Sequence, residues 1–171
     1  MSNQSFYFEE IKTKIGNIFI LENNKGVCVV MPSKDPRIQK IKKELSPEQG
    51  LIYYKKIRSN IIRFLDKKEK LIKIPITFIS GTKFQISVWK QIIKIPYGSS
   101  TSYSLIAEKI KNTKAVRAVG NAVGKNPIMI YVPCHRVLTK SGNLGEYAWG
   151  MSLKKKILNI ENIKVRWLTR I

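Results

Sequence analysis

The sequence is poor in the residues that bind metals or form disulfide bonds. Its 171 residues include one histidine and two cysteines, Cys28 and Cys134. Zinc sites usually take about four Cys and His ligands, so we predict no metal site, and we also predict no cofactor. One disulfide bond is possible in principle. No other feature indicates an oxidising compartment, and we expect two reduced thiols in a cytoplasmic protein.

Long apolar segments are also absent. The longest apolar stretches, such as residues 128–132, have the length of a strand, whereas a membrane-spanning helix needs about 18 apolar residues or more. Residues 1–10 contain two acidic residues and no basic cluster, unlike a signal peptide. We therefore predict no membrane partner. With 43% hydrophobic residues, the chain can fold as one medium domain or two small ones.

Acidic residues are few, because 11 Asp and Glu stand against 32 Lys and Arg, giving a formal net charge of +21. Such an excess attracts polyanions, and nucleic acid is the usual partner of so basic a chain. A Lys- and Ile-rich composition that only leaves a solvated basic surface would give the same charge. Charge alone therefore leaves both interpretations open.

The hydrophobic pattern changes near residue 80. Before it, short β-branched segments predict strands over residues 5–13, 16–22, 26–31 and 74–80. Ser46 and Pro47 predict the start of a helix that continues to Lys68. After it, helical spacing predicts helices over 82–95, 102–110, 114–123 and 152–162, and a strand over 128–132. Two short helices separated by Asn112 and Thr113, with Thr113 as cap, suggest a helix-turn-helix.

Two segments carry unusual chemistry. The second helix of the pair, residues 115–124, offers Ala, Val and Gly with Arg117 as its one long polar side chain, whereas a base-reading helix normally offers several. Arg117 could enter a base stack or meet a phosphate, or it could be a solvated side chain on a packed helix. Cys134 is followed by His135, the only histidine. The pair could form a reactive thiolate and its base, or a buried structural thiol beside a surface histidine.

From Gly81 to Glu161 the sequence resembles the O6-alkylguanine-DNA alkyltransferases, also called methylated-DNA–protein-cysteine methyltransferases. The matching motifs, in chain order, are Gly81–Trp89, Ile95–Gly98, Ser102–Tyr103, Arg117–Gly120, Asn126–Pro127 and Pro133–Val137, followed by Tyr147, Gly150 and Glu161. The last of the motifs, Pro-Cys-His-Arg-Val, is the family's most specific signature. The resemblance implies an α/β (α+β) fold with two domains. These are an RNase-H-like N-terminal domain over 1–80 and a winged-helix-like, helix-turn-helix alkyltransferase domain over 81–171.

The resemblance also implies a reaction. Cys134 would be the nucleophile that accepts the alkyl group irreversibly from O6 of guanine, or from O4 of thymine. His135 would deprotonate it through a water, Glu161 would orient His135, and Asn126 would order the active-site turn. The partner would be duplex DNA carrying the alkylated base, bound by a monomer.

Five residues would bind the substrate. Tyr103 would press on the target phosphate, and Arg117 would fill the place of the flipped nucleotide. The carbonyls of Cys134 and Val137 would accept the guanine amino group, the Ala148 amide would donate to O6, and Tyr147 would border the base. Flipping is expected on general grounds, because a thiolate cannot reach O6 inside a duplex.

Two residues depart from the family pattern. Glu146 stands where Gly or Asn is more usual, and Trp149 stands where many members carry Gly.

Three alternatives to an alkyltransferase also remain. They are a damage-sensing DNA-binding protein, although such relatives lack the acceptor cysteine; a transcriptional regulator; and a Cys-His hydrolase. Outside the motifs, we expect Cys28 to be a buried core residue. We expect Tyr53, Tyr54 and Trp167 to be packing residues.

Overall fold

The computed structural model describes residues 5–165, and the chain divides into two units. The first unit comprises the chain up to Ile79 together with Pro127–Met129, and the second comprises the remainder from Ser80 onward. Trp167 lies outside the described residues. No helix within them is long and apolar enough to cross a membrane.

The first unit is built on a four-stranded sheet. Its strands are β1 (Tyr7–Thr13), β2 (Gly16–Asn23), β3 (Gly26–Pro32) and β4 (Glu48–Gln49). The strand order is β3-β2-β1-β4, in which the first three strands are antiparallel and β4 runs parallel to β1. The three longer strands agree with the sequence prediction, and the arrangement is the RNase-H-like sheet that the resemblance implies. Cys28 is fully buried in β3, as predicted.

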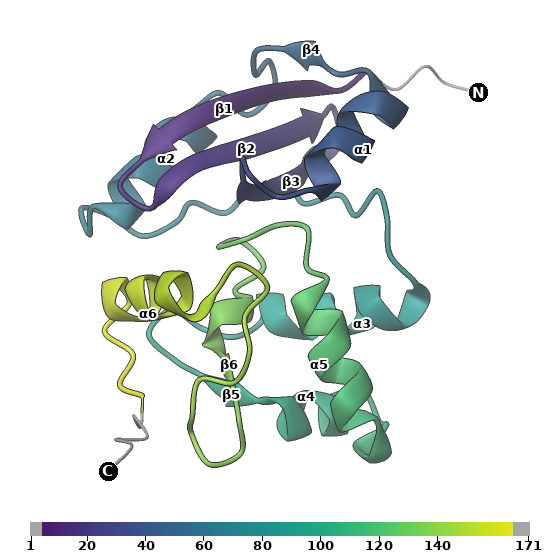
Figure 1. The fold of residues 1–171 in the computed structure, drawn as a ribbon, viewed down its shortest axis with the longest axis vertical. Helices are drawn as coiled ribbons and strands as arrows, with labels where there is room; N and C mark the ends of the chain where they lie inside the picture. Colours follow the sequence, from purple (N-terminus) through teal and green to yellow (C-terminus); the bar gives the residue numbers. More distant parts are fainter. Residues whose placement is uncertain (1–4, 166–171) are drawn as a thin grey trace. The chain divides into compact units, whose positions relative to one another are not determined.

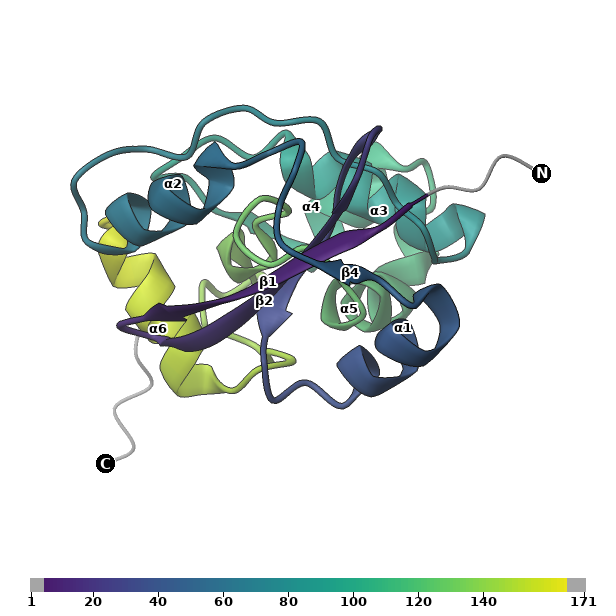
Figure 2. The same ribbon diagram turned by 90° about the horizontal axis from the view of Figure 1, so that it is seen from above.

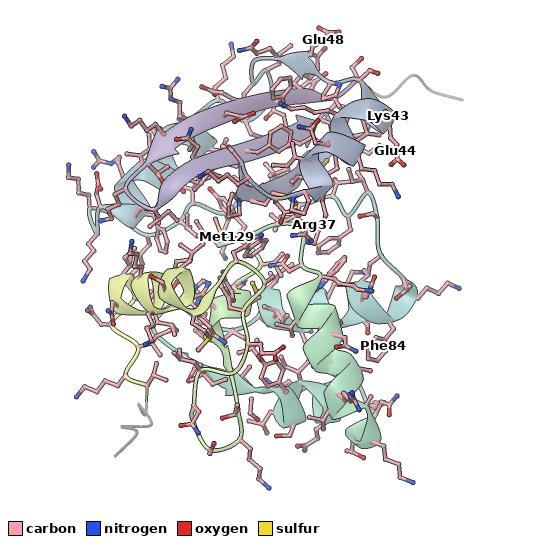
Figure 3. The ribbon with its side chains drawn as sticks, viewed as in Figure 1. Arg37, Lys43, Glu44, Glu48, Phe84 and Met129 are labelled. Atoms are coloured by element: carbon pink, nitrogen blue, oxygen red, sulfur yellow. The ribbon has the colours of Figure 1, made fainter. Side chains whose placement is uncertain are left out.

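Two helices cover opposite faces of this sheet, as the view from above shows (Figure 2). They are α1 (Arg37–Leu45) and α2 (Lys56–Leu65). Lys42 of α1 pairs with Glu10, whereas Arg58 of α2 pairs with Glu9. Neighbouring strand residues face opposite sides, which explains this division. Lys43 and Glu44 point away from the strands into solvent (Figure 3).

The predicted helix from Pro47 to Lys68 is wrong over its first half. Ser46 does not begin a helix but ends α1 in the left-handed conformation, with φ of 42°. Glu48 and Gln49 then pair with β1. The predicted strand over 74–80 forms only one bridge, between Val27 and Ile76. Tyr53 is exposed, although its ring contacts that of Tyr7.

The second unit is mainly helical (Figure 1). Its helices are α3 (Lys83–Ile93), α4 (Tyr103–Lys109), α5 (Val116–Gly124) and α6 (Met151–Ile160), with 3-10 turns η1 (Thr113–Ala115) and η2 (Cys134–Arg136). Thr82 and Gln85 form a reciprocal capping box at the start of α3. Strands β5 (Thr101–Ser102) and β6 (Val137–Leu138) pair in parallel.

The packed pair α4 and α5 is the predicted helix-turn-helix, and the predicted fold class is confirmed. The predicted cap is wrong, because Thr113 begins η1 and α5 has no side-chain cap. The predicted strand over 128–132 is also wrong. That segment makes one bridge, at Ile128, and then turns toward Cys134.

Candidate active site

Cys134 is held in a buried turn by one asparagine. Its side chain is 2% exposed. The amide nitrogen Nδ2 of Asn126 donates to Cys134 Sγ at 3.1 Å and to the Val132 carbonyl at 2.8 Å. Asn126 lies two residues after the end of α5 and is fully buried. The structure therefore brings together two residues eight positions apart, in agreement with the role that the resemblance implies for Asn126.

The backbone of this turn adopts an uncommon conformation. Ile130 has a φ of +73°, which is rare for a β-branched residue and costs about 1–3 kcal/mol. The Cys134 amide donates to the Val132 carbonyl at 2.7 Å and tightens the turn further. Such strain persists only when the surrounding packing holds it, so the position of the thiol is set by the fold.

A buried charge network lies beside the thiol. His135 Nε2 is 2.9 Å from Glu161 Oε1, and Arg136 donates from Nε and Nη2 to the two Glu161 oxygens, each at 2.7 Å. Arg136 Nη1 also donates to the Ile95 carbonyl at 2.6 Å. With Glu161 accepting from Nε2–H, the neutral imidazole keeps its lone pair on Nδ1. Nδ1 is buried and has no hydrogen-bond partner within residues 5–165.

The network sets the protonation states of its members. Burial opposes ionisation of Glu161, but hydrogen bonds from His135 and Arg136 outweigh it and lower the pKa of Glu161 to about 2. Burial lowers the pKa of His135, although Glu161 partly offsets this. At neutral pH the pair is therefore a carboxylate and a neutral imidazole, which is the form that can accept a proton.

The thiol itself needs such a base. Burial raises the pKa of Cys134, while hydrogen bonds with Asn126 and Tyr147 and the charge of Lys154 act in the opposite direction. Tyr147 Oη lies 3.9 Å from the sulfur. A buried thiol is protonated at rest, and thiolate formation depends on proton transfer to a neighbouring group.

Two residues of this site, Arg136 and Lys154, were not predicted from the sequence. Arg136 belongs to the quoted motif, but its two-point contact with Glu161 could not be read from it. Lys154 is fully buried, donates to the Val137 carbonyl at 2.8 Å and also to the Leu144 carbonyl. The spacing of Lys154 in the sequence does indicate burial. Lys154 precedes Ile157, Leu158 and Glu161 by three, four and seven residues, which places it on the same side of α6 as these buried residues.

Lys154 should assist thiolate formation. Its ammonium lies 5.8 Å from the Tyr147 ring centroid, and burial lowers its pKa to about 8. We expect Lys154→Met to slow alkyl transfer at pH 7 about tenfold and to move the pH–rate profile about one unit to higher pH. Lys156→Met, an exposed change on the same helix, should do neither. A loss of thermal stability without a shifted profile would show that Lys154 is only structural.

A pocket of about 740 Å³ opens over the thiol. Its lining includes Cys134, Tyr103, Arg117, Tyr147 and Ala148, which are five of the residues that the resemblance assigned to the site. Two glycines leave room for the Tyr103 side chain, which lines the pocket. A Cβ on Gly145 would lie 3.0 Å from Tyr103 Oη, and one on Gly120 would lie 3.9 Å from the Tyr103 ring.

Val137, which the resemblance also assigned to the site, is not among the described residues that line the pocket. It is fully buried beside Cys134, and its carbonyl accepts the Lys154 ammonium. A carbonyl oxygen has two lone pairs, so a second donor remains possible. Its expected contact with the guanine amino group stays a prediction.

The fold and the site together define a helix-turn-helix protein in which a buried cysteine, histidine and glutamate lie together and the cysteine lines an open pocket. The family model described as "6-O-methylguanine DNA methyltransferase, DNA binding domain" matches residues 83–163. The methylated-DNA–protein-cysteine methyltransferase of Methanosarcina mazei is 36% identical over 155 residues, which are 91% of this chain and 96% of that protein.

Two further relatives agree. The inducible methylated-DNA–protein-cysteine methyltransferase of Bacillus subtilis is 46% identical over 101 residues, covering 59% of this chain and 56% of that relative. The OGT protein of Mycobacterium tuberculosis, in a crystal structure with DNA, superposes with a TM-score of 0.80 at 28% identity, covering 91% of this chain and 92% of that one. The chain belongs to the methylated-DNA–protein-cysteine methyltransferase family.

Proposed function

We propose that this protein repairs alkylated duplex DNA by transferring the alkyl group from O6 of guanine, and from O4 of thymine, to its own Cys134. The observation that carries the proposal is the thiol held by Asn126 at the base of a pocket, beside the buried His135–Glu161 pair. The family's activity supports it, and the acceptor cysteine argues against a protein that only senses damage. Each copy would act once, as a monomer and without a cofactor.

The residues suggest the following step. His135 takes the thiol proton through a water, while Glu161 stabilises the resulting imidazolium. The thiolate attacks the alkyl carbon, so that an S–C bond forms as the C–O6 bond breaks. The electron pair returns to guanine, which gains a proton at N1, and the proton removed from Cys134 balances it. The thioether product has no ready leaving group, which explains a single turnover.

DNA would be bound through the second unit. Arg117 of α5 is exposed and lines the pocket, and Tyr103, which begins α4, lines it too. The small residues of α5 allow close approach to a groove, and inserting one side chain offsets part of the cost of flipping a base. The net charge of +21 supplies affinity that is independent of sequence. The predicted cytoplasmic location remains part of this proposal, and both cysteines are free thiols in the structure.

Intact-protein mass spectrometry with an O6-methylguanine duplex tests the proposal. We expect one added methyl group per protein, mapped to the peptide that contains Cys134 and not to the one that contains Cys28. Saturation at one group would establish the single-use reaction. An unchanged mass despite tight binding of the lesion duplex would instead favour the damage-sensing alternative.

Arg117→Ala should separate base flipping from chemistry. We expect duplex repair to slow about 10- to 100-fold, because the vacated stack is no longer filled, whereas reaction with free O6-benzylguanine should change less than about twofold. Lys56→Ala removes the same charge from an exposed position in the first unit and should leave duplex repair nearly unchanged. An equal loss of rate on the duplex and on free O6-benzylguanine would contradict the proposed role of Arg117 in base flipping.

A further inference from the structure

The pocket over Cys134 has one acidic side chain in its wall. Among the described residues that line it, Glu146 is the acid, whereas Arg117 and Lys125 are basic. Glu146 is solvent-exposed, and within residues 5–165 it has neither an ion pair nor a hydrogen bond from its side chain. Its charge is therefore exposed at the pocket lining, without an ion pair to neutralise it within the described residues.

The two residues that flank Glu146 in the sequence lie close to active-site side chains. Gly145 has a φ of +61°, and its missing Cβ leaves room for the Tyr103 hydroxyl, from which such a Cβ would be 3.0 Å away. Tyr147 reaches the sulfur of Cys134 at 3.9 Å, and its ring packs edge-on against Trp149 with centroids 5.4 Å apart. In the sequence, Glu146 thus lies between Gly145, which approaches Tyr103, and Tyr147, which approaches the sulfur of Cys134.

Electrostatics agree with this placement. Burial is the largest cause that raises the pKa of Tyr103. The negative charges of an ionised Cys134 and of Glu146 raise it further. Glu146 and the thiolate form of Cys134 therefore act on the same phenol. Low-dielectric walls focus such a field into a cleft more than onto an open surface.

We propose that Glu146 selects alkyl groups by charge, so that neutral and cationic adducts are transferred and anionic adducts are disfavoured. The inference rests on the proposed function and names its substrate class. To react, the alkyl carbon must come within about 3–3.5 Å of the sulfur. Any substituent on that carbon then shares the pocket with the Glu146 carboxylate. Repulsion between two like charges that share a pocket, in a medium between protein and water, can change a rate about fivefold.

Four duplexes of one sequence test the charge filter. They carry O6-methyl-, O6-(2-hydroxyethyl)-, O6-carboxymethyl- or O6-(2-aminoethyl)guanine at the same position. Single-turnover rate constants are measured with the protein in excess, and each is divided by that of the neutral hydroxyethyl duplex. The DNA is otherwise identical, and the intrinsic reactivity of each adduct cancels when two proteins are compared.

In Glu146→Gln we expect the relative rate of the carboxymethyl adduct to rise about fivefold and that of the aminoethyl adduct to fall by a similar factor. Glu146→Lys should move both further in the same directions. High salt should reduce the differences, because the pocket is open to solvent. Glu108→Gln removes an exposed acid of α4 that does not line this pocket, and it should leave both ratios unchanged.

The outcomes are distinguishable. A protein that does not react with the methyl duplex contradicts the proposed function itself. Reaction with the methyl duplex, combined with equal ratios in the wild-type protein and Glu146→Gln, overturns the charge filter alone. Rejection of the hydroxyethyl adduct as strongly as the carboxymethyl adduct would also overturn it, because size would then be the selecting property.

Discussion

Replacement of Cys134 by serine should abolish methyl transfer while leaving the protein folded and able to bind lesion DNA. Serine preserves the shape of the side chain and can still accept the hydrogen bond from Asn126. Its hydroxyl is a far weaker nucleophile toward an alkyl carbon than a thiolate, because its pKa is much higher and it stays protonated near pH 7. We expect the single-turnover rate to fall by at least about 10³-fold. Transfer of a labelled methyl group from DNA to protein measures it.

The chain offers its own control for this experiment. Cys28 is also buried, in β3, and burial raises its pKa to about 12. Its thiol contacts the Gly26 carbonyl and no member of the His135 network. Cys28→Ser should therefore retain full transfer. A Cys134→Ser protein that still accepts methyl groups would show that the nucleophile has been assigned to the wrong residue.

The two parts of the chain differed in how far their elements could be predicted. In the second unit, the capping residues of α3 and the apolar spacing of its helices are local signals, so helix positions were nearly right. In the first unit, residues 48–68 have helical spacing, yet Glu48 and Gln49 pair with β1. That pairing depends on a strand about 40 positions earlier in the chain and overrides local preference.

The site shows the same limit. From the sequence, Cys134 and His135 could be a reactive pair or a structural thiol beside a surface histidine, and their adjacency alone could not decide between the two. The structure places both in η2, a 3-10 turn, and His135 reaches α6 at Glu161. The roles of Cys134, His135 and Glu161 came from a resemblance between motifs. Lys154 has no such motif, and its contacts with two carbonyls exist only once α6 has packed.

The pair formed by Arg136 and Glu161 should be the most costly ionic contact to break. Both side chains are almost fully buried, so Glu161→Gln leaves the charge of Arg136 without a counterion. We expect this change to lower the free energy of unfolding by about 3–5 kcal/mol. Arg136→Met should cost a similar amount, and the double variant should cost clearly less than their sum. Chemical denaturation of the four proteins gives the coupling energy.

An exposed pair supplies the comparison. Lys40 and Glu44 are 3.6 Å apart on α1, with side chains 77% and 60% exposed. Glu44→Gln should therefore change the stability by less than about 0.5 kcal/mol. Additive effects of the Arg136 and Glu161 substitutions, or a Glu161→Gln protein as stable as Glu44→Gln, would contradict the stabilising role of the buried pair.

The pH dependence of stability gives an independent test of the same carboxylate. The pKa of Glu161 is about 2 in the folded protein and about 4.3 in an unfolded chain. A depressed pKa stabilises the fold above the unfolded value, and this contribution is lost as pH falls from about 5 toward 2. The difference corresponds to about 3 kcal/mol. Wild-type protein should therefore lose that much more stability over this range than the Arg136→Met/Glu161→Gln variant, whose position 161 does not titrate. Parallel acid profiles for the two proteins would mean that Glu161 is not held ionised by its neighbours.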